Sequence, residues 1–391
     1  MNSSGEVSLL LDCSLIHPDE QAVERMCRRI VRGVNWSEFL KLAIPHGLLP
    51  LAARNLAAYA ADIVPPITLA QLALYRRGVE ERNRGQATEM VRVLALFSKG
   101  GIRALPFKGP LLAAVEYGDV SLRESHDLDL WLPCEDLPAA GQLLRGAGYR
   151  SVAHRRGIPY LLDPDRGDCQ TEFQSGNGEV QIELHDELQS RQFSFLPDFD
   201  EVWERRRVVM LDGVEIPAFA PEDLLLTLAV HGSKHMWRRL SWVVDISALI
   251  GAHPRLDWTA TLGRARRWRC RRRLLSAVLL AEDLYHLELP ELVQVECRKH
   301  SYTRSSVSRV QNQIIDGMGA RTVANFISEL RNHTQNSDRF IDRLRIAFSY
   351  MKKILRNDEA EMLRSMPPNT LMLLRMSRGV RGLIGRLVRQ D

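Results

Sequence analysis

The period of the hydrophobic positions changes twice along the 391-residue chain. Residues 1–95 carry apolar side chains at helical spacing, interrupted by Pro45, Pro50 and the Pro65-Pro66 pair, and strand-like alternation is scarce. This pattern predicts an N-terminal helical segment over residues 1–95. The stretch "QATEMVRVLALFSKGGI" then predicts an amphipathic helix that ends at two glycines, because glycine adopts the left-handed C-cap conformation most easily.

The middle of the chain mixes both periods. The run "IRALPF" predicts a short strand, Pro110 suits the first turn of a helix over "LLAAVEY", and "DLDLWL" alternates with period two until Pro133. A helix over "CEDLPAAGQLLRGAG" then precedes three candidate strands, "YRSVAH", "QTEFQ" and "EVQIELH". This order predicts a small α+β domain with a mixed sheet over residues 96–217.

Helical spacing returns at Pro221, where Glu222 and Asp223 favour a helix N-terminus. The stretches "PEDLLLTLAVHGSKHMW", "SWVVDISALIGA" and "RLLSAVLLAEDLYH" predict successive helices, and further helices follow toward the C-terminus. We therefore predict a C-terminal helical domain over residues 218–391.

The composition, 45% hydrophobic and 26% charged, is that of a globular protein with a sizeable core. The six cysteines are scattered without a Cys-x-x-Cys pair, and the N-terminus lacks the three-part pattern of a signal peptide. No apolar run approaches the roughly 20 uncharged residues that a membrane-spanning helix needs. We therefore expect a cytoplasmic protein with no transmembrane segment.

The net charge of +5 is unevenly distributed. Arginines gather in "RARRWRCRRR", residues 264–273, which would suit nucleic acid or phosphate-rich ligands but is more often the solvated face of a helix. We do not expect nucleic acid as a partner. The amphipathic basic tail from residue 338 onward allows peripheral contact with an anionic membrane, although packing on the helical bundle is the more frequent outcome.

Three acidic residues alternate with apolar ones on two predicted strands. Asp127 and Asp129 project from the same face of "DLDLWL", and Glu183 has the same setting in "VQIELH". Like charges held this close repel one another unless a cation lies between them. A hard divalent ion, Mg²⁺ or Mn²⁺, is the natural occupant because it prefers carboxylates together with substrate phosphates.

A turn that suits phosphate precedes these carboxylates. Lys108 and Gly109 lie between a predicted strand and a predicted helix, whose N-terminal N–H groups can bind an anion. Arg123, four residues before Asp127, adds a second positive charge. Together these residues favour a metal and nucleotide site over the charged end of an ordinary strand.

Histidines supply further candidates. His231 and His235 share one face of a predicted helix, with Lys234 beside them. They suit a zinc site, a polar wall of the nucleotide pocket or ordinary helix packing, and a zinc site lacks an evident third ligand. His185 shares the face of Glu183, where it suits either a hydrogen bond to a phosphate or metal-bound water, or a structural role.

Several stretches together resemble one family. "FKG" followed by a helix, "EYGD", Arg123, "DLDLWL", "GYR" and "IELH" are similar to the uncharacterised nucleotidyltransferase family of the polymerase-β-like superfamily, often found in bacterial gene clusters for peptide natural products or polysaccharides. The resemblance runs on through "HGSKHMWRRLSWVVDISALI" and the basic tail. It implies a nucleotidyltransferase core flanked by N-terminal helices and a C-terminal helical bundle.

The resemblance also implies roles for single residues. Asp127 and Asp129 would bind the catalytic metals, and Glu183 would be the third carboxylate, as a metal ligand or as the base. Gly109 stands at the phosphate turn of the superfamily, with Lys108 and Arg123 as further phosphate-binding residues. The implied reaction is attack by an acceptor hydroxyl or phosphate oxygen on the α-phosphorus of a nucleoside triphosphate, with release of pyrophosphate.

The sequence departs from the superfamily in two ways. Pro110 replaces the usual second small residue and removes a backbone N–H donor, and the spacing from Gly109 to Asp127 is longer than usual. Two alternatives stay open: a non-catalytic nucleotide-binding or scaffold protein of the same fold, and a metal-dependent glycosyltransferase, in which Asp-x-Asp also holds a metal. The sequence identifies neither the nucleotide nor the acceptor, which would be a small molecule, a peptide or a saccharide.

Overall fold

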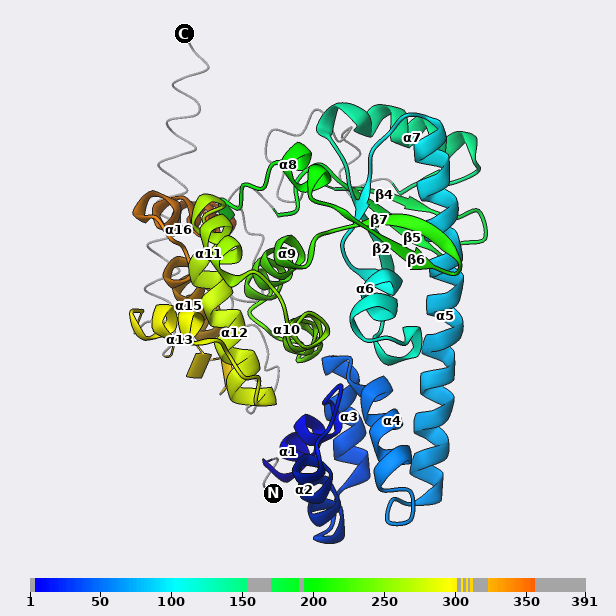
Figure 1. Ribbon diagram of the computed structural model, residues 1–391, viewed down its shortest axis with the longest axis vertical. Coiled ribbons are helices and arrows are strands. Elements are labelled where there is room, and N and C mark those ends of the chain that lie inside the picture. The colour runs from blue at the N-terminus through cyan, green and yellow to red at the C-terminus, as the bar shows by residue number, and fades with distance from the viewer. Residues whose placement is uncertain are drawn as a thin grey trace.

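The computed structural model describes residues 4–152, 170–189, 193–300 and 323–355, together with a few positions between 304 and 311. Its N-terminal part is helical, as predicted, and forms the lower end of the molecule in Figure 1. Pro50 and Pro66 lie in the first turns of helices, where their missing N–H groups are not needed, whereas Pro45 lies inside α3, one residue before its end. The helices are α1 (Ser4–Cys13), α2 (Glu20–Val31), α3 (Trp36–His46), α4 (Leu49–Tyr59) and α5 (Pro66–Lys99).

Helix α5 connects this end to the sheet (Figure 1). It is much longer than the predicted helix, but it does end at the predicted place, with Gly100 as its C-cap. Its second half carries Ala87, Met90, Leu94 and Phe97 at helical spacing, and all four are buried in the core beneath the sheet. Because α5 crosses residue 95, the predicted domain boundary there stays a prediction.

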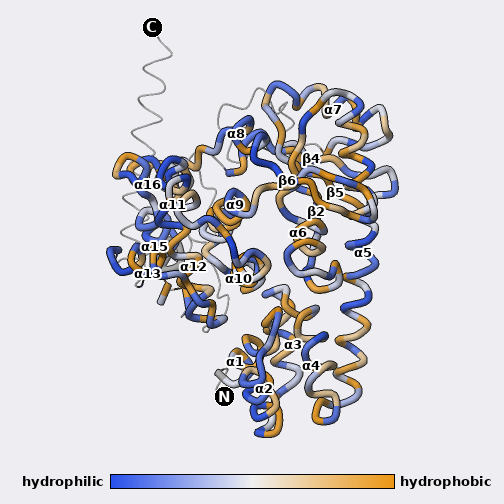
Figure 2. Tube along the Cα trace, in the orientation of Figure 1, coloured by the Kyte–Doolittle hydropathy of each residue, from blue (hydrophilic) through white to orange (hydrophobic). Residues whose placement is uncertain are grey.

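The predicted α+β core is confirmed as a five-stranded mixed sheet in the order β1-β2-β5-β4-β3. Strands β2 and β5 are parallel, and the other neighbouring pairs are antiparallel. Hydrophobic and hydrophilic positions alternate along the central strands, which are coloured in Figure 2 by the hydropathy of each residue, as expected for strands buried on one face. The elements are β1 (Leu105–Pro106), α6 (Gly109–Glu116), β2 (Asp127–Trp131), α7 (Leu137–Gly146), β3 (Arg150–Ser151), β4 (Gln170–Gln174) and β5 (Gln181–His185).

A second, two-stranded sheet was not predicted from the sequence. After α8 (Phe199–Glu204), strands β6 (Arg207–Leu211) and β7 (Val214–Ala218) pair in antiparallel fashion. Asp212 and Gly213 form the turn, both with positive φ. An Asp-Gly pair between alternating apolar residues is a strong hairpin signal, so the sequence did contain this information.

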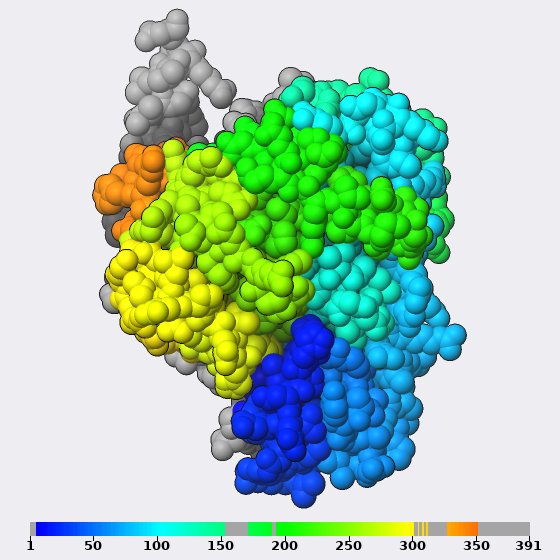
Figure 3. Space-filling model, in the orientation of Figure 1, coloured from blue at the N-terminus to red at the C-terminus, as the bar shows by residue number. Residues whose placement is uncertain are grey.

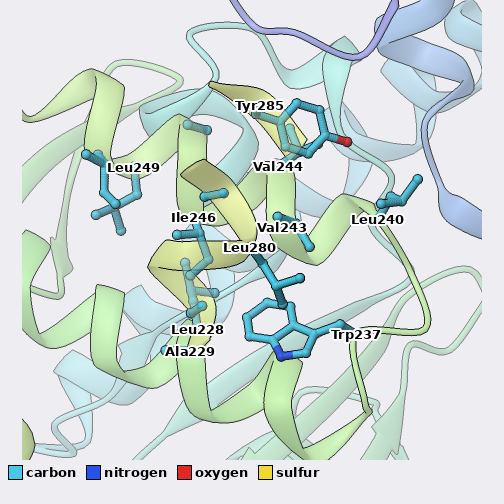
Figure 4. Close-up of a cluster of buried hydrophobic side chains, with 14 of the residues drawn as sticks. Leu228, Ala229, Trp237, Leu240, Val243, Val244, Ile246, Leu249, Leu280 and Tyr285 are labelled. Atoms are coloured by element: carbon cyan, nitrogen blue, oxygen red, sulfur yellow. The ribbon is translucent and has the colours of Figure 1, made fainter. Parts of the chain in front are cut away.

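The predicted C-terminal helices are α9 (Pro221–Lys234), α10 (Ser241–Ala252), α11 (Trp258–Arg267), α12 (Arg271–Tyr285), α13 (Glu291–Arg298), α15 (Val323–Gln335) and α16 (Phe340–Leu355). Helices α9, α10 and α12 share one hydrophobic core with the N-terminal helices. The N-terminal and C-terminal helices accordingly meet at the surface in Figure 3. Figure 4 shows the centre of this core, where Trp237 lies against aliphatic side chains such as Leu280.

The arginine run has a largely structural role. Arg264 pairs with Asp223 at 2.6 Å, Arg266 pairs with Glu296 at 3.2 Å, and Arg273 is buried. The prediction that this run forms the solvated face of a helix is therefore wrong for Arg273 and only partly right for its neighbours. These charges connect helices that are far apart in sequence.

The basic tail is described only as far as residue 355. Helix α16 leaves an apolar stripe exposed, made by Phe340, Ile341, Leu344 and Phe348. The membrane contact of the tail stays a prediction, because its remaining residues lie outside the described part. No helix in the described ranges has the length and hydropathy to cross a membrane.

Candidate active site

The predicted carboxylates lie on one face of β2 and β5. Asp129 pairs in register with Glu183, and Asp127 pairs with Gln181. Alternation places these side chains on one face, opposite the leucines and isoleucine that pack toward α5. We call the side chains of Asp127, Asp129 and Glu183 the carboxylate face.

Asp129 is the centre of this face and is fully buried. Its Oδ2 lies 3.0 Å from Nζ of Lys108, and its Oδ1 lies 3.0 Å from Nε2 of His185. The ring of His185 packs edge-on against Phe107, with 5.2 Å between ring centroids, which fixes its orientation. The structure thus brings four predicted site residues, Lys108, Asp129, Glu183 and His185, into contact distance.

The carboxylate face carries more negative charge than Lys108 can neutralise. Burial raises the pKa of Asp129, but Lys108 and His185 outweigh burial and hold that pKa below its usual range. Burial and the neighbouring Asp129 raise the pKa of Asp127, and burial with both aspartates raises the pKa of Glu183 to about 8. Two carboxyls therefore remain costly to ionise unless another cation approaches.

The donor set suits a divalent cation. Asp129, Glu183 and His185 each offer one ligand atom, and these atoms lie within 4.8 Å of one another. The carboxylate oxygens match the ligand chemistry of Mg²⁺ or Mn²⁺, and the His185 ring nitrogen is hydrogen-bonded to Asp129. Asp127 lies on the same face, next to this group in register, and remains partly exposed. The residues present therefore fit a metal.

Gly109 brings the phosphate turn against β2. Its φ is +70°, and a Cβ atom there would lie 3.1 Å from the carbonyl oxygen of Asp127 and 3.3 Å from Oγ of Ser125. Only glycine meets both demands without strain. Pro110 lies in the first turn of α6, so the helix itself loses no hydrogen bond there.

Arg123 forms a buried clamp with a residue far along the chain. Its Nε and Nη2 donate to the two carboxylate oxygens of Asp245 in α10, at 2.7 and 3.0 Å, and the Tyr117 hydroxyl donates to the same carboxylate at 2.6 Å. Burial lowers the pKa of Arg123, but Asp245 outweighs burial and raises it. All three guanidinium nitrogens are engaged, because Nη1 also donates to the carbonyl oxygen of Glu124 at 3.2 Å, so contact between Arg123 and phosphate stays a prediction.

The segment before β2 is also held from α5 and from the loop before α10. Asn83 of α5 donates to the carbonyl oxygen of Arg123 at 2.7 Å. Glu124 accepts from the Tyr75 hydroxyl at 2.8 Å and from Arg239 at 3.2 Å. Sequence analysis missed Asn83, Arg239 and the pairing of Asp245 with Arg123, because nothing in their local pattern indicates partners so far away.

The predicted histidine group lies at the C-terminal end of α9. His231 is in the last turn of α9, Lys234 ends the helix, and His235 is its C-cap. Burial and then the positive charge of Lys108 lower the pKa of His231 well below its usual value.

A groove of about 770 Å³ lies elsewhere on the same domain. It runs between α5, the end of α7 and the loop that joins β4 to β5. Gln86 and Glu89 line it together with Tyr149, whose hydroxyl donates to Glu89. No predicted site residue lines this groove, so it is separate from the carboxylate face.

Comparison with known proteins identifies the family. The model of the uncharacterised nucleotidyltransferase family matches residues 32–286. Two solved structures of nucleotidyltransferases are similar over part of the chain, and no curated protein matches it.

The first of these structures is the solution structure of the antibiotic-resistance factor ANT(2'')-Ia, with 15% identity over 52% of this chain and 98% of that chain, at a TM-score of 0.32. The second is the crystal structure of an antigenic nucleotidyltransferase-like protein from Paracoccidioides brasiliensis, with 16% identity over 60% of this chain and 92% of that chain, also at 0.32. Similarity this distant carries no conclusion about the site.

A small mixed sheet with carboxylates on adjacent parallel strands, beside a Lys-Gly turn, is the architecture of a nucleotidyltransferase. The chain belongs to the uncharacterised nucleotidyltransferase family. It is accordingly an enzyme of the nucleotidyl-transfer class. Membership disfavours both alternatives that the sequence left open, the glycosyltransferase and the non-catalytic scaffold.

Proposed function

We propose that the protein is a metal-dependent nucleotidyltransferase that moves a nucleoside monophosphate from an NTP to an acceptor hydroxyl or phosphate. The observation that carries this proposal is the carboxylate face itself. Asp129 and Glu183 lie side by side on parallel strands, and Lys108 of the phosphate turn reaches Asp129 at 3.0 Å. Metal-binding and phosphate-binding groups thus meet at one point.

Each residue has a distinct task in the proposed reaction. Asp127, Asp129 and Glu183 would hold Mg²⁺ or Mn²⁺, which supplies charge neutralisation for the phosphoryl oxygens when bound. Lys108, already positioned by Asp129, would bind the triphosphate at the Gly109 turn, and Arg123 is proposed as a second phosphate contact or as the anchor of the segment before β2. His185 holds the Asp129 carboxylate in place.

The proposed reaction balances as a substitution at phosphorus. The acceptor oxygen forms a bond to the α-phosphorus, and the bond between that phosphorus and the α,β-bridging oxygen breaks, so that pyrophosphate leaves. The acceptor proton passes to a base, for which Glu183 is the candidate on this face. Positioning and charge neutralisation supply most of the catalysis in such reactions.

A thermal-shift experiment tests the proposal. ATP, GTP, CTP and UTP are each added with Mg²⁺ or Mn²⁺, and at least one pair should raise the melting temperature, since ligands that bind the native state stabilise it. Asp129→Asn should abolish the metal-dependent part of the shift and lower pyrophosphate release by at least about 100-fold, the scale of losing a main transition-state contact. The exposed Glu135→Gln is the matched control and should behave as wild type.

The proposal fails if no nucleotide shifts the melting temperature and Asp129→Asn changes nothing. Binding without pyrophosphate release in the presence of acceptors would instead favour a non-catalytic nucleotide-binding protein. We propose that the acceptor belongs to natural-product or polysaccharide biosynthesis. Incubation with labelled NTP and the products of neighbouring genes, followed by mass analysis for an added nucleoside monophosphate, identifies it.

A further inference from the structure

Three partly exposed rings gather where α9 meets α10. His231, His235 and Trp242 pack against one another, with ring centroids 4.7 Å apart for the two histidines. The Trp242 centroid lies 5.0 Å from that of His235 and 5.5 Å from that of His231. We call these three rings the ring wall. Because each ring keeps some exposure, the wall is not an interior part of the core.

The turn after α9 builds this wall. Met236 and Trp237 adopt left-handed conformations, with φ of 59° and 53°, which reverses the chain. Trp237 then covers Gly232 so closely that a Cβ at that glycine would lie 2.2 Å from its ring. Figure 4 shows Trp237 anchored in the core near Leu280. The reversal returns Trp242 against the last turn of α9.

The ring wall lies beside the segment that leads to the carboxylate face. Arg239 and Asp245, three residues to either side of Trp242, bind Glu124 and Arg123 respectively. The Trp242 N–H donates to the carbonyl oxygen of Arg239 at 3.2 Å, and Asp245 lies three residues further along α10, so Trp242 is close to both contacts to this segment. The segment that these two pairs hold runs into Asp127, whose carbonyl oxygen lies against the Gly109 turn, so the wall lies beside the segment that carries the phosphate turn.

The chemistry of the wall matches one part of a nucleotide. At neutral pH the lowered pKa keeps the His231 ring uncharged, so it presents an aromatic face. Aromatic side chains bind nucleobases by stacking, which tolerates any base because each base has a π-face. The triphosphate has its own partners in Lys108 and the Gly109 turn, which leaves the base as the part that requires an apolar surface.

We infer that the ring wall stacks on the nucleobase of the bound NTP and that Trp242 provides the principal contact. This inference rests on the proposed function and adds the substrate part that the carboxylate face does not contact. It explains why a ring on α10 stays partly exposed between a buried ion pair, Arg123–Asp245, and a part-buried one, Arg239–Glu124. It also implies modest selectivity among the four bases.

Comparing the binding of two ligands distinguishes a contact with the nucleobase from a contact with the phosphates. Binding to the wild type, Trp242→Leu and Trp242→Phe is measured by calorimetry with Mg²⁺, using the NTP that gives the largest thermal shift and inorganic tripolyphosphate, which has no base. Loss of one stacking contact should weaken NTP binding by about 10-fold or more in Trp242→Leu. Trp242→Phe, which keeps an aromatic face, should stay within about 3-fold of wild type.

Tripolyphosphate affinity should be the same in all three proteins. The inference is overturned if Trp242→Leu binds NTP as well as wild type does, or if both ligands lose affinity equally, which would indicate a purely structural role. If the wild type binds neither ligand, the proposed function itself has failed. If Trp242→Leu does not fold, the test uses the quenching of tryptophan fluorescence by NTP. This quenching should largely disappear in Trp242→Phe. Quenching that persists in Trp242→Phe overturns the inference.

Discussion

The carboxylate face and the ring wall are built in opposite ways. Strand alternation and one parallel pairing place Asp129 beside Glu183, so this face is defined almost entirely within the sheet. The ring wall comes from two helices and a left-handed turn, and it is held against the sheet domain by a buried ion pair. The comparison teaches that the geometry of neighbouring strands is enough to bring charged side chains together. A binding surface formed by separate helices also needs contacts between residues that are far apart in sequence.

These two regions therefore differ in what disrupts them. Neutralising Asp127 or Glu183, whose burial makes them costly to ionise, should remove chemistry and leave the fold, because the strand pairing does not depend on their charge. Removing one partner of the ion pair that anchors the ring wall should mainly lower the free energy of unfolding, because the other partner is then a buried charge without a counter-charge. The Asp129→Asn variant above tests the carboxylate face, and the three predictions below test the wall and its turn, in order of decreasing effect.

Asp245→Asn should have the largest effect on stability. It leaves the Arg123 guanidinium buried, with 8% exposure, beside a neutral amide. Removing one partner of a buried ion pair costs about 3 to 5 kcal/mol, and the retained amide oxygen, which still accepts from Tyr117, places the expected loss near 3 kcal/mol. The free energy of unfolding is measured by urea denaturation.

The double variant Arg123→Met/Asp245→Asn separates charge from packing. Since the unpaired charge is then gone, the double variant should lose less stability than the sum of the two single variants. Strict additivity would show that Arg123 and Asp245 do not interact, and the ring wall would then lack its main anchor.

Gly232→Ala should disturb the wall through packing alone. The added methyl group would overlap the Trp237 ring, and such overpacking typically costs about 1 to 3 kcal/mol. Gly251→Ala in α10 is the matched control, because nothing lies within 4 Å of a Cβ there and alanine favours a helix. The two variants are compared by urea denaturation, and equal stability would mean that the turn tolerates a different path.

The smallest expected effect is a dependence of stability on pH. It comes from a histidine of α3 that contacts the turn between α9 and α10. His46 of α3 is buried, and its Nδ1 accepts a hydrogen bond from the N–H of Leu240 at 3.3 Å. Burial lowers its pKa from 6.5 to about 4. Between those values the unfolded chain binds a proton that the folded protein does not, so stability falls as the pH decreases.

The expected loss from pH 7.5 to pH 5 is about 2 kcal/mol for this group, since each pKa unit corresponds to about 1.4 kcal/mol. Urea denaturation of wild type and His46→Asn at both pH values isolates the His46 contribution. The variant should depend less on pH, and an identical dependence in both proteins would show that His46 is not responsible.

Much of the fold was predictable because its signals are local. The alternation in "DLDLWL" and "QIELH" predicted β2 and β5, and the apolar spacing predicted α9, α10 and α12. The β6–β7 hairpin was missed despite its Asp-Gly turn, so that failure lay in the interpretation of the pattern. The length of α5 was missed because Pro66, taken as a break, begins the helix.

The sequence by itself determined which side chains share a face. Period-two alternation placed Asp127 and Asp129 together, and the Lys108-Gly109 pair marked a turn between a strand and a helix. Only the tertiary structure decided which faces meet: that β5 lies parallel to β2, so that Glu183 is beside Asp129, and that Asp245 reaches Arg123 across 122 residues. The physical reason is that local geometry follows from backbone sterics, whereas pairing between distant elements is selected by the packing and charge balance of the whole core.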